Sequence, residues 1–269
     1  MFLKVIACEI AFREICHAAA QSPNLIDLEF LSQGLHDVPC AGREQLQARL
    51  NAVPTGKYDA ILVGYGLCGG MINGLTTPHT PLVIPRAHDC ITLFLGSRER
   101  YAQTIAAQPG AYYYTSGWLE CLRRRGEKTL PDQTMFLPTR AALSGNASAA
   151  YELWVKKFGE DQARYLSQVM DQWTSTYTHG VLIDFDFSRP LRLRDQVEAV
   201  CAKRGWQFGA MEGDLRLLQH WLNGEWTPED FLIVTPSRKV TPSYDQGVIQ
   251  AEAVDSPASR HEAFDRAPE

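Results

Sequence analysis

The chain lacks any long apolar stretch. No uninterrupted apolar run approaches the roughly 20 residues that a membrane-spanning helix needs. The N-terminal segment already contains the charged residues Lys4, Glu9 and Arg13. The start therefore matches neither a secretory signal peptide nor a membrane span. We expect a soluble cytoplasmic protein without a membrane partner.

Basic charge is also scarce. The chain has 26 Lys and Arg residues against 31 Asp and Glu residues, a formal net charge of -5. Nucleic-acid binding depends on clustered Lys and Arg, and the one basic run, residues 123–125, is interpreted as a solvated helix end. No nucleic-acid partner is expected.

The seven cysteines include no C-x-x-C pair. Without an export signal they are expected in a reducing compartment, where thiols bind metals, act in catalysis or simply pack. Four are interpreted as packing or surface thiols: Cys16, Cys40, Cys121 and Cys201. The remaining three are candidates for chemistry: Cys8, Cys68 and Cys90.

Short apolar runs alternate with amphipathic segments over most of the chain. This pattern predicts strands at 2–8, 25–31, 58–64, 82–84, 180–184, 206–211 and 231–234. It predicts helices at 9–20, 42–53, 90–108, 147–177, 193–204 and 214–222. The alternation indicates an α/β fold of parallel βαβ units with a parallel-sheet, Rossmann-like core.

The predicted elements group into two similar α/β lobes with a cleft between them. Residues 1–108 form the first lobe, 109–146 an aromatic-rich linking segment, and 147–239 the second lobe. One mixed sheet of about seven strands is the alternative, since no sequence repeat establishes a duplication. Residues 240–269 are polar and without periodicity, which predicts a disordered tail.

Chemically active residue types follow the predicted strands directly. The run at 58–64 leads into GYGLCGG, and the run at 82–84 leads into PRAHDC. Because carboxyl ends of parallel strands meet at one edge of a sheet, where open α/β sheets bind ligands, these loops should lie together. Cys8, which ends the first run, would join them.

Four side chains from this edge form a predicted metal site: Cys8, Cys68, His88 and Cys90. Thiolate is a soft ligand and imidazole a borderline one, so the set favours zinc. An H-x-C pair in an extended loop also places two ligands on the same side of the backbone. The alternative is an iron–sulfur cluster on the three cysteines, with His88 outside the ligand set.

Further residues complete the predicted site. The residues expected to move a proton are Glu9, Asp89 and Glu120. Those expected to hold an anionic part of a small-molecule substrate are Arg86, Arg98 and Arg100. Those expected beside the substrate are Tyr65, Tyr113 and Trp118. Surface charge and core packing are the competing interpretations of the arginines and the aromatic residues.

The segment GYGLCG also matches the dinucleotide-binding pattern G-x-G-x-x-G, with Asp89 about twenty residues further on. That motif normally follows the first strand and opens a long helix. Here it follows the third predicted strand, and the next segment is broken by Gly74 and Pro78. We therefore interpret these glycines as allowing close backbone approach or tight turns.

Several motifs resemble a bacterial and archaeal family defined by domain of unknown function 1638. They are ACEIAFREI, VGYGLC, VIPRAHDCITLFLGSRERY and YYYTSGW followed by Glu120. The resemblance covers roughly residues 1–235, and PRAHDC with GSRERY is its most specific part. Genes of this family often lie near corrinoid-dependent methyltransferase systems, which implies corrinoid or methyltransferase proteins as partners.

The ligand types His88, Cys90 and Cys68 are also similar to the zinc ligands of thiol methyltransferases, which are β/α barrels and share only the ligand chemistry. We therefore expect a zinc enzyme that activates a thiol or water, with methyl or one-carbon transfer as the preferred reaction and hydrolysis next. A non-catalytic accessory protein that carries a metal or corrinoid is the third hypothesis.

Overall fold

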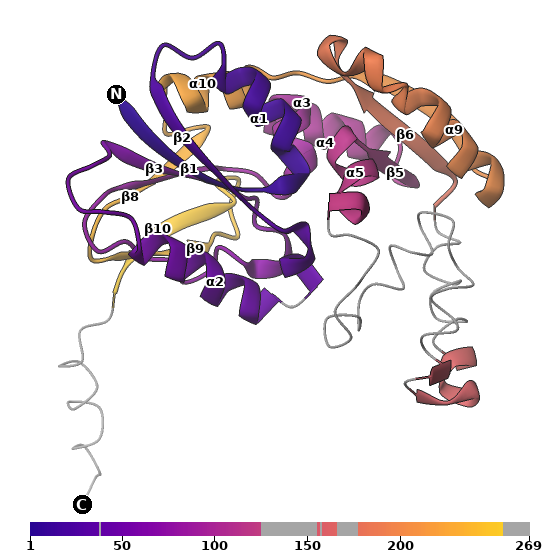
Figure 1. Cartoon of the computed structure of the whole chain (residues 1–269), viewed down its shortest axis with the longest axis horizontal. Helices are drawn as coiled ribbons and strands as arrows, with labels where there is room; N and C mark the ends of the chain where they lie inside the picture. Colours follow the sequence, from indigo (N-terminus) through magenta and orange to yellow (C-terminus); the bar gives the residue numbers. More distant parts are fainter. Residues whose placement is uncertain (38, 125–154, 157, 166–176, 255–269) are drawn as a thin grey trace, which may run out of the picture.

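Two sheets organise the part of the chain that this computed structural model describes, residues 1–37, 39–124, 155–156, 158–165 and 177–254 (Figure 1). The larger sheet has five strands in the order β2-β1-β3-β4-β8. Its first four strands are parallel, and β8 runs antiparallel to β4. The strands are β1 (Phe2–Cys8), β2 (Leu25–Leu31), β3 (Ala60–Gly64), β4 (Leu82–Pro85) and β8 (Phe231–Val234). The predicted α/β class with a mostly parallel sheet is confirmed.

The central strands of this sheet are the most apolar ones. Every residue of β3 is buried, and so are the residues of β1 from Val5 to Cys8, as expected of strands covered on both faces. The edge strand β2 is only partly buried. Helices α1 (Phe12–Ala19) and α2 (Pro39–Asn51) lie on opposite sides of the sheet (Figure 1).

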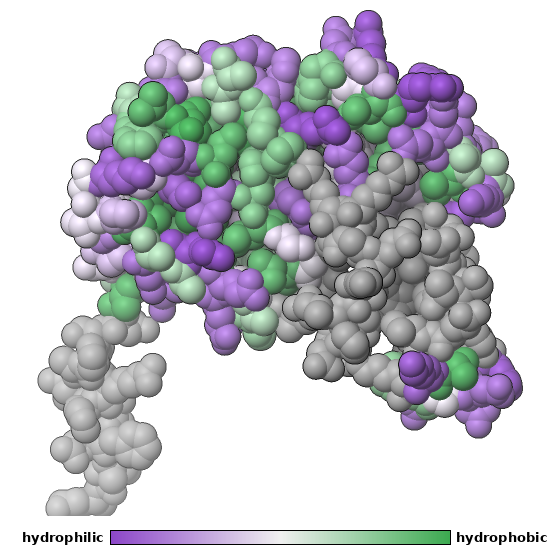
Figure 2. All heavy atoms as spheres, viewed as in Figure 1, coloured by the Kyte–Doolittle hydropathy of each residue, from purple (hydrophilic) through white to green (hydrophobic). Residues whose placement is uncertain are grey.

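The smaller sheet has three parallel strands in the order β5-β6-β7. They are β5 (Ala111–Tyr114), β6 (His179–Asp184) and β7 (Gln207–Glu212). Helix α9 (Leu193–Arg204) packs on this sheet through buried residues spaced four apart, Leu193, Val197 and Cys201. Its opposite side is part of the hydrophilic surface at the right of Figure 2.

One prediction fails in this sheet. Residues 109–146 were expected to be an irregular aromatic linking segment, but the described part of it, 109–124, contains β5 and α5 (Ser116–Arg124). The run of three tyrosines makes a strand because it pairs with β6, which lies far along the sequence. A strand of only four residues, preceded by Pro109 and Gly110, is too short for its pattern of apolar and polar residues to be recognised from sequence.

The chain then returns to the larger sheet. Helix α10 (Arg216–Asn223) contacts α1, and β8 pairs with β4. The two sheets therefore divide the chain differently from the predicted lobes, because elements within 216–234 belong to the sheet that begins at residue 2.

The predicted disordered tail is wrong for its first part. Strands β9 (Arg238–Pro242) and β10 (Ile249–Ala253) form an antiparallel hairpin. Val240, Val248 and Ile249 are buried in the main core, and this burial holds a segment whose composition looks disordered. Residues 255–269 lie outside the described part.

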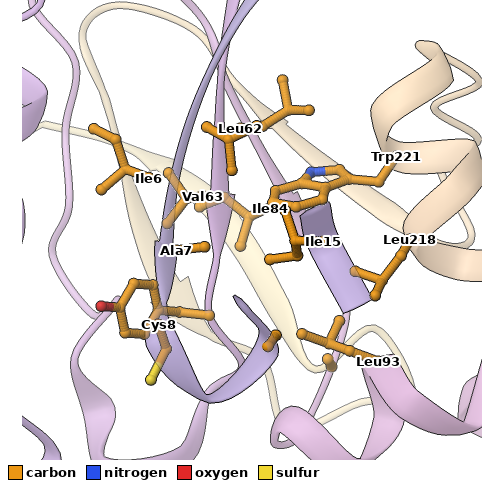
Figure 3. Close-up of a cluster of buried hydrophobic side chains, with 14 of the residues drawn as sticks. Ile6, Ala7, Cys8, Ile15, Leu62, Val63, Ile84, Leu93, Leu218 and Trp221 are labelled. Atoms are coloured by element: carbon orange, nitrogen blue, oxygen red, sulfur yellow. The ribbon is translucent and has the colours of Figure 1, made fainter. Parts of the chain in front are cut away.

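Part of the main core, shown in Figure 3, lies between the larger sheet and helix α10, and the same cluster includes Leu46 and Leu50 of α2. Trp221 is fully buried, and its indole Nε1 donates a hydrogen bond to the carbonyl of Val83 at 3.1 Å. The same cluster includes Tyr113 and Ile183 of the smaller sheet. One continuous core thus joins the two sheets.

Two remaining predictions concern helices. Of the segment 147–177, the structure describes 155–156, 158–165 and 177. Residues 155–156, 158 and 160–165 are helical and 177 is not; the rest of that prediction lies outside the described residues. Among the described residues, no helix has the length and apolar character needed to cross a membrane.

Candidate functional site

A pocket of about 440 Å³ lies at the carboxyl ends of the central strands of the larger sheet. It is lined from that sheet by residues that follow β1, β2, β3 and β4, and from the other side by residues around β5. The polar lining residues are Cys8, Gln33, His36, Tyr65, Asp89 and Cys90. The aromatic residues on the other side are Tyr112, Tyr113, Trp118 and Tyr177. The pocket therefore lies at the edge of the sheet where the site was expected.

Two of the predicted metal ligands line this pocket. Cys8 is the last residue of β1 and is 3% exposed. Cys90 is the first residue of α3 (Cys90–Leu95) and is partly buried. Their strands are separated by β3 in the sheet, so the fold brings to one pocket two thiols that are far apart in sequence.

Asp89 stands beside Cys90 and caps α3. Its Oδ1 accepts a hydrogen bond from the backbone N–H of Ile91 at 3.0 Å, and its Oδ2 accepts one from the hydroxyl of Tyr101 at 3.0 Å. Burial raises the pKa of this carboxyl above its ordinary value, although both hydrogen bonds act in the opposite direction. The fold therefore fixes an acidic group in the pocket wall.

The glycine-rich loop after β3 packs directly on Asp89. A Cβ atom on Gly66 would lie 2.7 Å from the Cα of Asp89, and the N–H of Leu67 donates to the carbonyl of Ala87 at 2.9 Å. The loop then enters only a short 3₁₀ turn, η3 (Cys68–Gly70). Close approach explains the first glycines, and no long helix opens there as a dinucleotide site would need.

The other two predicted metal ligands are placed differently. His88 is exposed, does not line the pocket, and stacks on Tyr101 with ring centroids 6.0 Å apart. The backbone of Cys68 begins η3, and its side chain lies outside the described part. Within the described residues no three His, Cys, Asp or Glu side chains group so as to hold a metal ion. The described residues alone thus supply two thiols and no complete ligand set.

His36 is a pocket residue that the sequence reasoning missed. It lies in η2 (Gln33–Asp37), which follows β2, and its ring stacks on Tyr65 at 5.7 Å. The missed signal was topological: β2 is parallel to β1, so residues just beyond its carboxyl end reach the same edge of the sheet.

Glu9 and Glu120 support the structure around the pocket without lining it. Glu9 Oε1 accepts hydrogen bonds from the N–H of Gln33 at 2.8 Å and from the hydroxyl of Ser32 at 3.1 Å. Glu120 forms an ion pair with Arg13, at 2.7 Å between Oε1 and Nη2. Glu9 thus holds the turn that presents Gln33 and His36, and Glu120 joins α5 to α1.

The three predicted anion-binding arginines lie away from the pocket. Arg86 donates from Nε to the carbonyl of Pro228 at 2.7 Å, and Arg98 donates from Nη2 to the carbonyl of Glu229 at 2.7 Å. Arg100 donates to the carbonyl of Glu212. Each guanidinium ties separate segments together through backbone carbonyls, and none lines the pocket.

The predicted aromatic residues, in contrast, do line the pocket: Tyr65, Tyr113 and Trp118. The hydroxyl of Tyr113 is buried and has no hydrogen-bond partner among the described residues, and burial raises its pKa. Next to it, the Tyr112 ring meets Trp118 at 6.3 Å and 64° and Tyr177 at 5.4 Å and 88°. The smaller sheet therefore contributes an aromatic wall.

A second buried acid, Glu14 of α1, lies outside the pocket lining. Its Oε1 accepts a hydrogen bond from the hydroxyl of Ser116 at 2.9 Å, at the start of α5. Burial raises its pKa from 4.5 to about 7. The sequence showed Glu14 only as a charge on an amphipathic helix, because its burial depends on α5.

Comparisons with known proteins return one family. The model of the family described as "Protein of unknown function (DUF1638)" matches residues 30–222. No curated protein and no solved structure matches the chain. Since the match covers more than half of the sequence and includes Tyr65, Asp89, Cys90 and Trp118, the chain belongs to the DUF1638 family of proteins of unknown function.

Proposed function

We propose that this protein is an enzyme whose active site is the pocket beyond the carboxyl ends of β1, β3 and β4. The observation that supports this most is that Cys8, Asp89 and Cys90 line one pocket of about 440 Å³ opposite an aromatic wall. A concave site with a few convergent polar groups is where small molecules usually bind. In this proposal the larger sheet is a Rossmann-like core, and the two sheets are lobes on either side of the pocket.

Cys8 and Cys90, together with Cys68, are the proposed ligands of a zinc ion. Thiolates suit zinc, two of the three thiols line the pocket, and the third lies two residues after the pocket-lining Gly66. His36 replaces His88 as the proposed imidazole ligand, since His36 lines the pocket and His88 is exposed. When bound, such an ion would keep a thiol or a water deprotonated at neutral pH.

The protein residues have separate roles in this proposal. Asp89 accepts or returns a proton, because its carboxyl lines the pocket and is held by Tyr101 and the N–H of Ile91. Tyr65, Tyr113 and Trp118 bind the substrate and exclude water. Methyl or one-carbon transfer is the proposed reaction class, in the cytoplasm and in association with corrinoid or methyltransferase proteins.

Elemental analysis tests the metal. The purified protein is expected to contain about one zinc per chain, and Cys8→Ser, Cys68→Ser and Cys90→Ser are expected to lose it. Matched controls are Cys121→Ser and Cys201→Ser, which change buried cysteines outside the pocket. Unchanged zinc in all three pocket variants would refute the ligand set.

An iron–sulfur cluster is the second candidate, and one observation favours it. Because His88 is exposed and outside the pocket, the predicted ligand set reduces to three cysteines, the number that holds a cluster with one open iron. Anaerobically purified protein with visible absorption, and with iron and sulfide lost in the same three variants, would replace zinc by a cluster.

A further inference from the structure

In the aromatic wall of the pocket, Tyr112 contacts two other ring side chains edge to face. Tyr112 meets Trp118 at 64° and Tyr177 at 88°, with ring centroids 6.3 and 5.4 Å apart. In such edge-to-face contacts the edge of one ring meets the face of the other, so the ring surface open to a ligand is the part that faces the pocket. All three side chains line the pocket and are only partly buried, so a ligand can contact them.

The charge of the described lining has one sign. Asp89 contributes a carboxyl group to the pocket lining, and no Lys or Arg is among the described residues that line the pocket. The arginines that the sequence suggested for anion binding, Arg86, Arg98 and Arg100, donate to backbone carbonyls outside the pocket. Within the described part, this lining offers an acid and ring faces, both of which attract positive charge.

A cationic ligand would also supply what Asp89 lacks. Its carboxyl oxygens are hydrogen-bonded to a hydroxyl and a backbone N–H, and no ion pair of Asp89 with Lys or Arg occurs among the described residues. Partial burial of a carboxylate without a counter-charge has a desolvation cost. An ammonium group in the pocket would offset that cost and gain contact with the π faces beside it.

We propose that the pocket binds a small organic cation, an ammonium group bearing methyl or other short alkyl substituents, against Tyr112, Trp118 and Tyr177 with Asp89 as its counter-charge. The inference rests on the proposed function in using the same pocket, and it names the substrate class. Alkyl groups on the nitrogen match the apolar lining from Ile91, Leu93 and Ile105. A carboxylate or phosphate substrate, as the arginines had suggested, is disfavoured.

Calorimetric titration of the full chain with matched probes tests the charge. The cation is choline, the neutral isostere is 3,3-dimethylbutan-1-ol, and the anion of similar shape is 3,3-dimethylbutanoate. Cation–π contact and the carboxylate together are expected to make choline bind at least about tenfold more tightly than the neutral isostere. The anion is expected to bind more weakly than either.

Two pairs of variants locate the effect. Trp118→Leu keeps an apolar side chain and removes the ring face, and Asp89→Asn keeps a helix-capping side chain and removes the charge. Each is expected to lower the preference for choline over the isostere by about fivefold or more. The controls Trp226→Leu and Asp214→Asn, whose residues lie outside the pocket lining, are expected to leave it unchanged.

Equal affinity for choline and its isostere, tighter binding of the anion, or absence of choline binding would each overturn the inference. So would a choline preference that persists in both pocket variants. These outcomes are independent of the metal content of the protein, which tests the proposed function. A zinc-loaded protein that prefers the neutral isostere would keep the function and remove only the substrate class.

Discussion

The two sheets contribute different kinds of side chain to the pocket. Residues after strands of the five-stranded sheet bring thiols and a carboxyl group, Cys8, Asp89 and Cys90, whereas the three-stranded sheet brings Tyr112 and Tyr113. Reactive groups and aromatic recognition surfaces thus come from separate layers that share one core. Mutations can therefore measure separately how much the core of the larger sheet, the contact between α1 and α5, and the aromatic wall contribute to stability.

The largest expected loss of stability comes from a substitution in the core of the larger sheet. Trp221→Ala removes a fully buried indole and its hydrogen bond to Val83, and large-to-small changes of this kind cost about 3–5 kcal/mol. Trp206→Ala, at the residue just before β7 of the smaller sheet and only partly buried, is the comparison and should cost less. Urea unfolding followed by circular dichroism measures both; a larger loss in Trp206→Ala would reverse the ranking of the two sheets.

The next effect concerns Glu14, which joins α1 of the larger layer to α5. Its pKa is about 7 in the folded state and 4.5 ordinarily, so the folded protein binds this proton more tightly than the unfolded chain does. Stability from this group is present below about pH 4.5 and is lost as pH rises to about 7, a change of about 3 kcal/mol.

Glu14→Gln should remove this part of the pH dependence, and stability measured from pH 4.5 to pH 8 checks it. Ser116→Ala sharpens the test. The hydrogen bond from Ser116 lowers the pKa of Glu14, so its loss should extend the decline to higher pH. Parallel stability curves for the wild type and Glu14→Gln would contradict the assignment.

The smallest effect is expected at the aromatic wall. The Tyr113 hydroxyl is buried without a protein hydrogen-bond partner among the described residues, so Tyr113→Phe should leave stability unchanged or raise it by about 1 kcal/mol. Tyr58 is the comparison variant, because its partly buried hydroxyl donates to Asp27 at 2.5 Å. Tyr58→Phe should destabilise the protein by about 1 kcal/mol. Equal losses of stability in both variants would indicate that the Tyr113 hydroxyl forms a hydrogen bond in solution.

Much of the larger sheet could be predicted from sequence. β1, β2 and β8 have the predicted bounds, because continuous apolar runs with turn residues at their ends leave few alternatives. The strand β5 and the hairpin β9–β10 could not be predicted. They are strands because of their partners, β6 for one and each other for the hairpin, and short polar or aromatic segments carry little local signal.

The predicted site divides in the same way. Cys8, Tyr65, Asp89, Cys90, Tyr113 and Trp118 line the pocket, and all but the last two follow from the rule that parallel strands end at one edge. The prediction that Arg86, Arg98 and Arg100 bind an anion found no support, because sequence does not distinguish an arginine open to a ligand from one bonded to backbone carbonyls. His36 was missed because its strand ends in residues that look like an ordinary turn.

The sequence by itself determined the α/β class, the parallel direction of the first strands and the edge at which polar residues gather, since the alternation of apolar strands and helices predicts parallel βαβ units. Tertiary structure alone decided which acids and arginines are structural, where β8 and the hairpin return, and which aromatic residues close the pocket. Those outcomes depend on contacts between residues distant in the chain, and burial and hydrogen bonding are properties of such contacts, not of residue type.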